Sequence, residues 1–232
     1  MQTEKNVSPP CIIIFQPEHS VLAGAIARAL VPDLFGELPA EVLAAIAQHD
    51  YGWSSSDTAQ MQSLAQRLPR PFPALSNEEI MPSWRASIQH ARSQSRLAYV
   101  IVSRHFTTLA TGDESKAAFV EEETERRASV EQDLGCATSD LNRWTGAIGF
   151  CDLVSLYLCC GSEEAAEFPL AHPADPDSAN ARRTILSKED GSLYFSPPTL
   201  KGAVPLSLEC RSYAGDTADT APYRLEWRFP NG

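Results

Sequence analysis

The chain has 232 residues, of which 43% are hydrophobic and 21% charged, and its formal net charge is −11. This balance is typical of one folded domain, or of one domain with a small appendage, and excludes a disordered chain. The acidic charge argues against a basic surface for nucleic acid, and no apolar run approaches the roughly 20 residues that span a bilayer. Residues 1–10 lack the apolar core of a signal peptide, so we expect a cytoplasmic protein without nucleic-acid or membrane partners.

Helical periodicity dominates the first two thirds of the chain. The β-branched run at 11–15 favours a short strand. Apolar residues at helical spacing then predict helices from Pro17 to before Pro32, from near Pro39 to near Gly52, from 77 onwards, and over 96–109, 116–134 and 140–160. Residues 53–76 are rich in Ser, Gln and Pro and predict a long loop with one short helix. The charged run at 121–127 is typical of a solvated helix face with ion pairs at spacing four.

The C-terminal part has a different pattern. Residues 162–187 contain three prolines and several Asp and Ser residues, which indicate a linker or surface loop. Alternation of apolar and polar residues over 205–213 and 223–229 predicts antiparallel strands with one buried face. The predicted organisation is therefore a flexible tail at 1–10, a helical domain at 11–161, the linker at 162–187 and a small β-rich appendage at 188–232. The predicted fold class is mainly α.

Four ionisable residues interrupt apolar helical faces. His19, His49, His105 and Asp152 each lie three, four or seven residues from aliphatic neighbours, which places them on the faces that should be buried. A buried carboxylate without a partner is costly, so Asp152 needs a cation or several hydrogen-bond donors. Imidazole and carboxylate together suit Zn, Mn or Fe(II). The pattern predicts a divalent-metal site, with a metal-free polar core as the alternative.

The pair His49-Asp50 adds to this prediction. Adjacent helical residues point about 100° apart, so both can reach one ion only where a helix ends, and Gly52 permits an end there. A metal with open coordination positions lowers the pKa of bound water towards 7, which is the chemistry of phosphoester hydrolysis.

The order His19, His49-Asp50, Asp152 resembles the H…HD…D pattern of the HD-domain metal-dependent phosphohydrolases. The strings HSVLAGAIA, AIAQHDYGW, SRHFTTLA and CDLVSLYLC resemble an uncharacterised, mainly bacterial family of unknown function that is similar to HD domains. The resemblance implies an HD-like helical bundle with metal ligands at His19, His49, Asp50 and Asp152. It implies that His105 is a further ligand or a substrate contact. The usual HD-x-G-K string is replaced by HDYGW, and the missing lysine weakens assignment to the nucleotide hydrolases.

The expected function is hydrolysis of a small, anionic, phosphorylated substrate with one or two divalent ions (Mn, Zn, Fe or Mg). Asp50 would bridge two ions or accept a proton from water, and His105 and Arg104 complete the predicted catalytic set. Arg104 would stabilise phosphate charge, since guanidinium matches phosphate oxygens, or else serve at the surface. Trp53 and Asp57 would line the substrate pocket, with core packing as the alternative for Trp53. A non-catalytic module that binds metal or a small anion, and an HD-like di-iron oxygenase, remain alternatives, as does a homo-oligomer.

Overall fold

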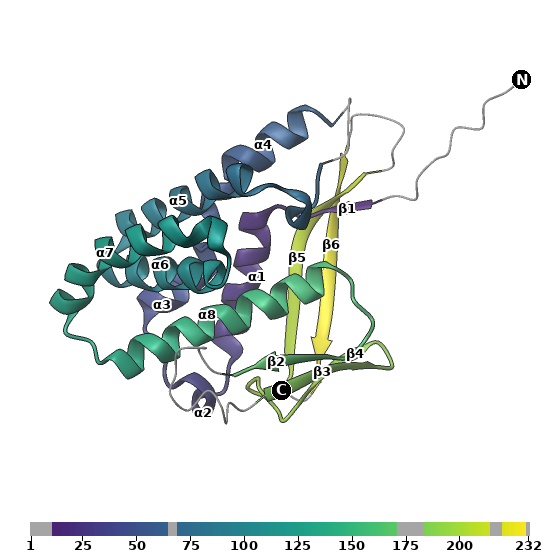
Figure 1. Cartoon of the computed structure of the whole chain (residues 1–232). Helices are drawn as coiled ribbons and strands as arrows, with labels where there is room; N and C mark the ends of the chain where they lie inside the picture. Colours follow the sequence, from purple (N-terminus) through teal and green to yellow (C-terminus); the bar gives the residue numbers. More distant parts are fainter. Residues whose placement is uncertain (1–10, 65–68, 171–182, 214–219, 231–232) are drawn as a thin grey trace, which may run out of the picture.

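A computed structural model describes residues 11–64, 69–170, 183–213 and 220–230 of the chain, so the predicted tail at 1–10 lies outside the described residues. The helices form one body beside two small sheets (Figure 1), which confirms the mainly α prediction. The α-helices are α1 (Gln16–Ala29), α2 (Pro32–Phe35), α3 (Ala40–Gln48), α4 (Ser54–Gln62), α5 (Asn77–Gln94), α6 (Arg96–Ala110), α7 (Ala117–Leu134) and α8 (Thr138–Cys159). Short 3₁₀ helices lie at Tyr51–Trp53, Phe72–Ala74 and Glu114–Lys116. Among the described residues, no helix has both the length and the apolarity to cross a membrane.

The helices α1, α3, α6 and α8 enclose the centre of the bundle. Helix α1 packs on α3 and α8, and α6 packs on α3 and α8 from the other side. The crossing of α1 and α3 is close because Gly24 lacks a side chain: a Cβ there would lie 2.4 Å from Cβ of Ala47. A larger residue would separate the two helices, which carry His19 and His49 at their ends.

Helices α5 and α7 form the outer layer against α6. Helix α5 begins with a capping box, in which Ser76 and Glu79 exchange side-chain and backbone hydrogen bonds and so satisfy two free N–H groups. Helix α6 begins where Ser95 Oγ accepts from the backbone N of Ala98 at 3.0 Å.

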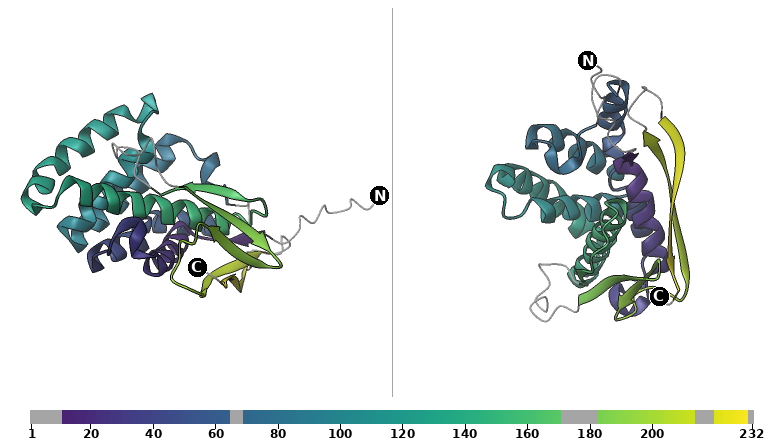
Figure 2. Two further views of the ribbon diagram at one scale, coloured as in Figure 1. Left: turned by 90° about the horizontal axis from the view of Figure 1, so that it is seen from below. Right: turned by 90° about the vertical axis from the view of Figure 1, so that its right-hand side faces the viewer.

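Each of the two sheets has three antiparallel strands. One has the order β1 (Cys11–Ile13), β5 (Val204–Tyr213), β6 (Thr220–Phe229), and the other β2 (Ala166–Pro169), β3 (Arg183–Glu189), β4 (Ser192–Ser196). Figure 2 shows the long strands β5 and β6 lying along the side of the helical body. Strand β1 pairs with β5 in a register that sets Cys11 opposite Tyr213. The first strand of the chain therefore belongs to the C-terminal sheet.

The sheets share the core of the helices. Phe195 of β4 packs against Phe150 of α8 with ring centroids 6.0 Å apart, and against Phe229 of β6 at 5.5 Å. The β-rich region at the C-terminal end therefore packs on the helical core of the same chain. Strand β2 and the start of β3 fall within the stretch 162–187 that was expected to be a linker. Helix α4 likewise replaces the first part of the loop expected at 53–76.

Candidate metal site

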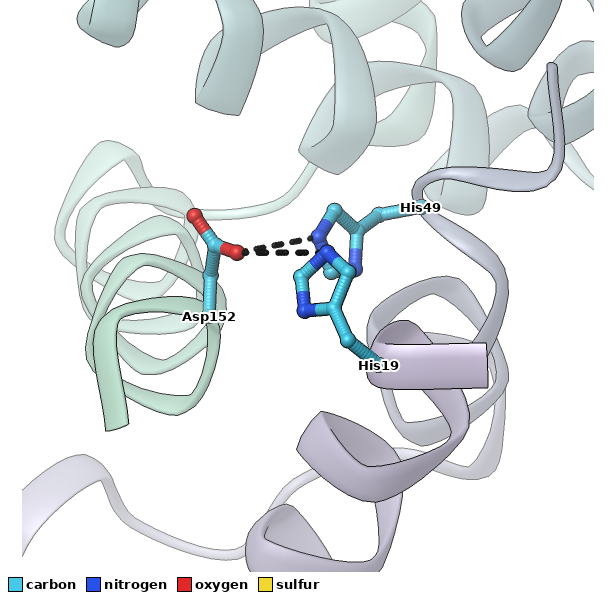
Figure 3. A group of neighbouring side chains, drawn as sticks. All are labelled: His19, His49 and Asp152. Carbon is cyan, nitrogen blue, oxygen red and sulfur yellow. Dashed lines mark hydrogen bonds and ion pairs between the residues drawn. The ribbon is translucent and has the colours of Figure 1, made fainter. Parts of the chain in front are cut away.

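Five of the predicted site residues converge at the centre of the bundle from four segments. His19 lies in the first two turns of α1, His105 on α6 and Asp152 on α8, while His49 and Asp50 follow the last residue of α3. All five are at least 93% buried. Figure 3 shows His19 and His49 side by side, facing Asp152 across the space between α1, α3 and α8.

The side chains form a compact group of imidazoles around two carboxylates. His19 Nε2 lies 2.7 Å from Asp50 Oδ2 and 3.8 Å from Asp152 Oδ1. His49 Nε2 lies 3.3 Å from the same oxygen of Asp152 and 3.6 Å from Asp50 Oδ2. His105 Nε2 lies 3.5 Å from the second oxygen, Asp152 Oδ2. The ligand atoms of His19, His49 and Asp152 all lie within 4.8 Å of one another, which is close enough to hold one metal ion.

Both His19 and His49 are oriented through their other ring nitrogen. His49 Nδ1 lies 2.8 Å from the carbonyl oxygen of Ile46, and a carbonyl only accepts, so Nδ1 carries the proton. Ser155 Oγ donates to the backbone oxygen of Asp152 at 2.8 Å, which leaves it to accept from His19 Nδ1, also at 2.8 Å. In the neutral rings both Nε2 lone pairs therefore face the carboxylates. This is the arrangement that holds histidines as metal ligands.

The pKa values follow from burial and from this charge arrangement. Burial by itself lowers the pKa of His49, but the charge of Asp50 and the hydrogen bond to Asp152 outweigh it and raise that pKa to about 9. Burial acts to raise the pKa of Asp152, but His49 and the other imidazoles hold it well below its usual range. Burial lowers the pKa of His105 to about 4. Without a metal, His49 therefore carries a proton at neutral pH, and its positive charge faces the carboxylate of Asp152.

His105 has the one unsatisfied atom of the group. Its Nε2 is buried and has no hydrogen-bond partner among the described residues. A buried polar atom without a partner costs about 1–3 kcal/mol, so it calls for a ligand or an explanation. Three imidazole nitrogens and two carboxylates form a mixed N/O donor set, which fits Zn, Mn or Fe(II). The residues present thus fit a divalent ion.

The remaining predicted site residues do not join this group. Arg104 is bonded away from the group: its Nε donates to Glu131 of α7 at 2.8 Å and its Nη1 donates to Asn142, near the start of α8, at 2.8 Å. Neighbouring residues of a helix point about 100° apart, so Arg104 and His105 face different sides of α6. Trp53 is 1% exposed and packs edge-on against Phe72, which is the packing alternative.

Asp57 is buried on α4 and contacts the start of α1 in place of a substrate pocket. Its Oδ2 accepts from the backbone N of Gln16 at 2.9 Å. Burial raises the pKa of Asp57 to about 6 in spite of this hydrogen bond, and the charge of Asp50 adds to the rise. Ser155, which orients His19, was missed in the sequence. The available signal was a serine three residues after Asp152 on an otherwise apolar helix.

A family model matches residues 4–212, so the chain belongs to the family described as "Protein of unknown function (DUF3891)". This confirms the predicted membership in a family of unknown function. No curated protein and no solved structure matches the chain. The similarity to HD domains stays a prediction.

Proposed function

We propose that the chain is a divalent-metal-dependent phosphohydrolase whose ion is held by His19, His49, Asp50 and Asp152, with His105 as a further ligand or a substrate contact. The observation that supports metal binding is the direction of the donor atoms. Three buried Nε2 atoms face two carboxylates, and two of these rings are fixed through Nδ1. Among the described residues, no lysine or arginine forms an ion pair with either carboxylate, so the cation has to come from outside or be a proton.

The same residues supply the remaining chemistry of the proposal. A bound divalent ion polarises a phosphoryl oxygen and lowers the pKa of water, as phosphoester hydrolysis requires. In this proposal Asp50 accepts the proton that the attacking water loses. His105, neutral at pH 7 because its pKa is lowered, offers its unpartnered Nε2 to a substrate oxygen. Similarity of the H…HD…D order to HD-domain phosphohydrolases is the reason to propose a phosphoester rather than another substrate.

A non-catalytic metal-binding module is the second candidate, and burial is the observation that favours it. The exposed fractions of the five residues are only 1–7%. A substrate therefore needs an opening between the helices before it can meet the ion, whereas a structural or sensory ion does not.

The test uses untagged protein. Metal content is measured by mass spectrometry, and turnover of a phosphoester panel is measured with added Mn²⁺ or Zn²⁺. We expect one or two ions per chain and turnover that Asp152→Asn abolishes. The matched control is His90→Ala. His90 lies outside the group, and its Nε2 forms a hydrogen bond with the side chain of Gln48. Bound metal without turnover would favour the binding module, and two iron ions with oxygen consumption the oxygenase. A metal-free protein that takes up no ion would contradict all three.

A further inference from the structure

The first turn of α1 is held by contacts from outside the helix. The first N–H groups of a helix have no partner within it, and Gln16 is the first residue of α1. Its N–H donates to Asp57 Oδ2 at 2.9 Å, across 41 residues of sequence. One residue earlier, the N–H of Phe15 donates to Glu18 Oε2 at 2.8 Å. The carboxylate of Asp57 therefore caps α1 from another element.

The segment that carries His49 and Asp50 also carries Asp57. It touches α1 at two points, where Asp50 Oδ2 meets His19 Nε2 at 2.7 Å and Asp57 Oδ2 meets Gln16 N. Gln16 and His19 are three residues apart, about one helical turn. The two contacts thus fix both the axial position and the rotation of that turn relative to the residues after α3.

The segment is itself held firmly at Gly52. Gly52 N donates to Ser87 Oγ at 3.0 Å. A Cβ at Gly52 would lie 2.3 Å from the backbone oxygen of Ser83 and 2.3 Å from the backbone N of Ser87. The segment is therefore pressed directly onto α5 and gives Asp57 a fixed base from which to hold α1.

We propose that Asp57 is a positioning residue for the metal site: by capping the first turn of α1, it presents His19 Nε2 to Asp50 and Asp152. This inference rests on the proposed metal binding. The hydrogen bond, rather than the charge, does the positioning, because burial makes the ionised carboxylate costly at this place while the bond to Gln16 needs only an oxygen. An asparagine oxygen can take the same role.

The experiment is a titration of Co²⁺ into the metal-free full-length chain at pH 7.5, followed by calorimetry and by the visible spectrum of the ion. We expect Asp57→Ala to raise the Kd about tenfold and to change the spectrum, in line with the loss of other groups that orient ligands. Asp57→Asn should bind within about twofold of the wild type, since it keeps the acceptor. The matched control is Glu79→Ala, which also removes a carboxylate that accepts a backbone N–H. Glu79 Oε2 accepts from the backbone N of Ser76 at 2.9 Å, and its helix α5 carries none of the site residues. Glu79→Ala should leave the Kd and the spectrum unchanged.

A second variant removes the donor of the same hydrogen bond. It tests the proposal even if Asp57→Ala does not fold. Gln16→Pro deletes the donor at a helix position where proline is well tolerated. It should weaken Co²⁺ binding as Asp57→Ala does. A wild-type Kd in either variant would overturn the proposal, as would equal weakening in Asp57→Asn and Asp57→Ala. If the wild type itself binds no Co²⁺, the proposed function fails and this inference with it. If the wild type binds and Asp57→Ala binds equally, only this inference fails.

Discussion

The two faces of helix α6 carry a partly buried polar cluster and a fully buried one, which differ in the cations that face their carboxylates. On the face towards α7, Glu131 Oε1 accepts from Nε of Arg104 at 2.8 Å and from Nε of Arg127 at 3.1 Å. Arg127 also donates to Thr107 Oγ1 at 3.0 Å. On the face towards α8, His105 meets Asp152, and no guanidinium is within ion-pair distance of that carboxylate among the described residues.

The difference shows which cluster has capacity for a ligand. In the arginine cluster each carboxylate is bonded by fixed cations, so an added ion would have to displace a partner. The expected solvated face at 121–127 is confirmed for most of its residues, including the pair of Arg126 with Glu122 at spacing four, whereas Glu123 is 2% exposed and accepts from Ser103 and Arg126. In the histidine cluster the cationic charge is a removable proton on His49, and His105 Nε2 has no hydrogen-bond partner among the described residues.

The largest effect that separates the clusters should come from Asp152→Asn. The change keeps the shape but removes the charge that faces three imidazoles, so the Kd for Mn²⁺ should rise about 100-fold or more, the upper end of the losses seen for ligand-orienting groups. Calorimetric titration measures it. Glu131→Gln, the same chemical change in the arginine cluster, should leave the Kd unchanged. Equal effects of the two variants would remove the distinction.

Within the arginine cluster, Glu131→Ala should have the largest effect on stability. It leaves two guanidiniums without their shared partner, and the expected loss in the free energy of unfolding is about 2 kcal/mol, reduced from the value for fully buried pairs because these side chains are 13–23% exposed. Urea unfolding measures it. Glu226→Ala, which breaks an exposed pair with Arg224, should cost almost nothing.

The metal-free protein should lose stability on the alkaline side through His49. Its pKa is raised to about 9 in the fold from 6.5, so its contribution is complete below pH 6.5 and is lost as the pH rises through 9. We expect a loss of about 3 kcal/mol between pH 6.5 and 9.5, measured by urea unfolding with a chelator present. His49→Gln should flatten this dependence, while Glu131→Ala should retain it. A flat wild-type profile would contradict the assigned charge state.

Loss of one hydroxyl in each cluster should produce a smaller difference in metal affinity. Ser155→Ala frees Nδ1 of His19, and the Kd for Mn²⁺ should rise about tenfold. Thr107→Val removes the hydroxyl that accepts from Arg127 and should leave the Kd at its wild-type value. Each variant should lower the free energy of unfolding by about 1 kcal/mol. A metal affinity that responds to Thr107→Val would show that the clusters are coupled.

The smallest effect should come from His105→Leu, which should raise the stability of the metal-free protein and lower its metal affinity. His105→Leu removes a buried nitrogen that has no partner, so the metal-free protein should gain about 1 kcal/mol while its metal affinity falls. Tyr99→Phe is the matched change, since Tyr99 OH on the same helix is also buried and has no hydrogen-bond partner in the described part of the chain. It should be neutral or stabilising without any change in affinity. Thermal unfolding and calorimetry measure both quantities.

Spacing along helices could predict much of the candidate site. His19, His105 and Asp152 interrupt apolar stripes, and a residue on such a stripe is buried whatever the neighbouring helix is. The side of the helix to which a residue points was predicted less well. Arg104 was grouped with His105 because the two are adjacent in the sequence, but adjacent side chains on a helix point about 100° apart. Contacts between distant elements left no local signal. The bond from Asp57 to Gln16 and the pairing of β1 with β5 depend on tertiary packing that no periodicity encodes.

The pairing of Cys11 with Tyr213 also bears on how the chain matures on the ribosome. A nascent chain that has emerged as far as α8 already holds all five side chains of the group. The strand that leads into α1 still lacks its neighbour at that point, because β5 spans Val204–Tyr213 and is synthesised later. We therefore expect the proposed metal site to be completed late in synthesis, only after residues 204–213 have left the exit tunnel.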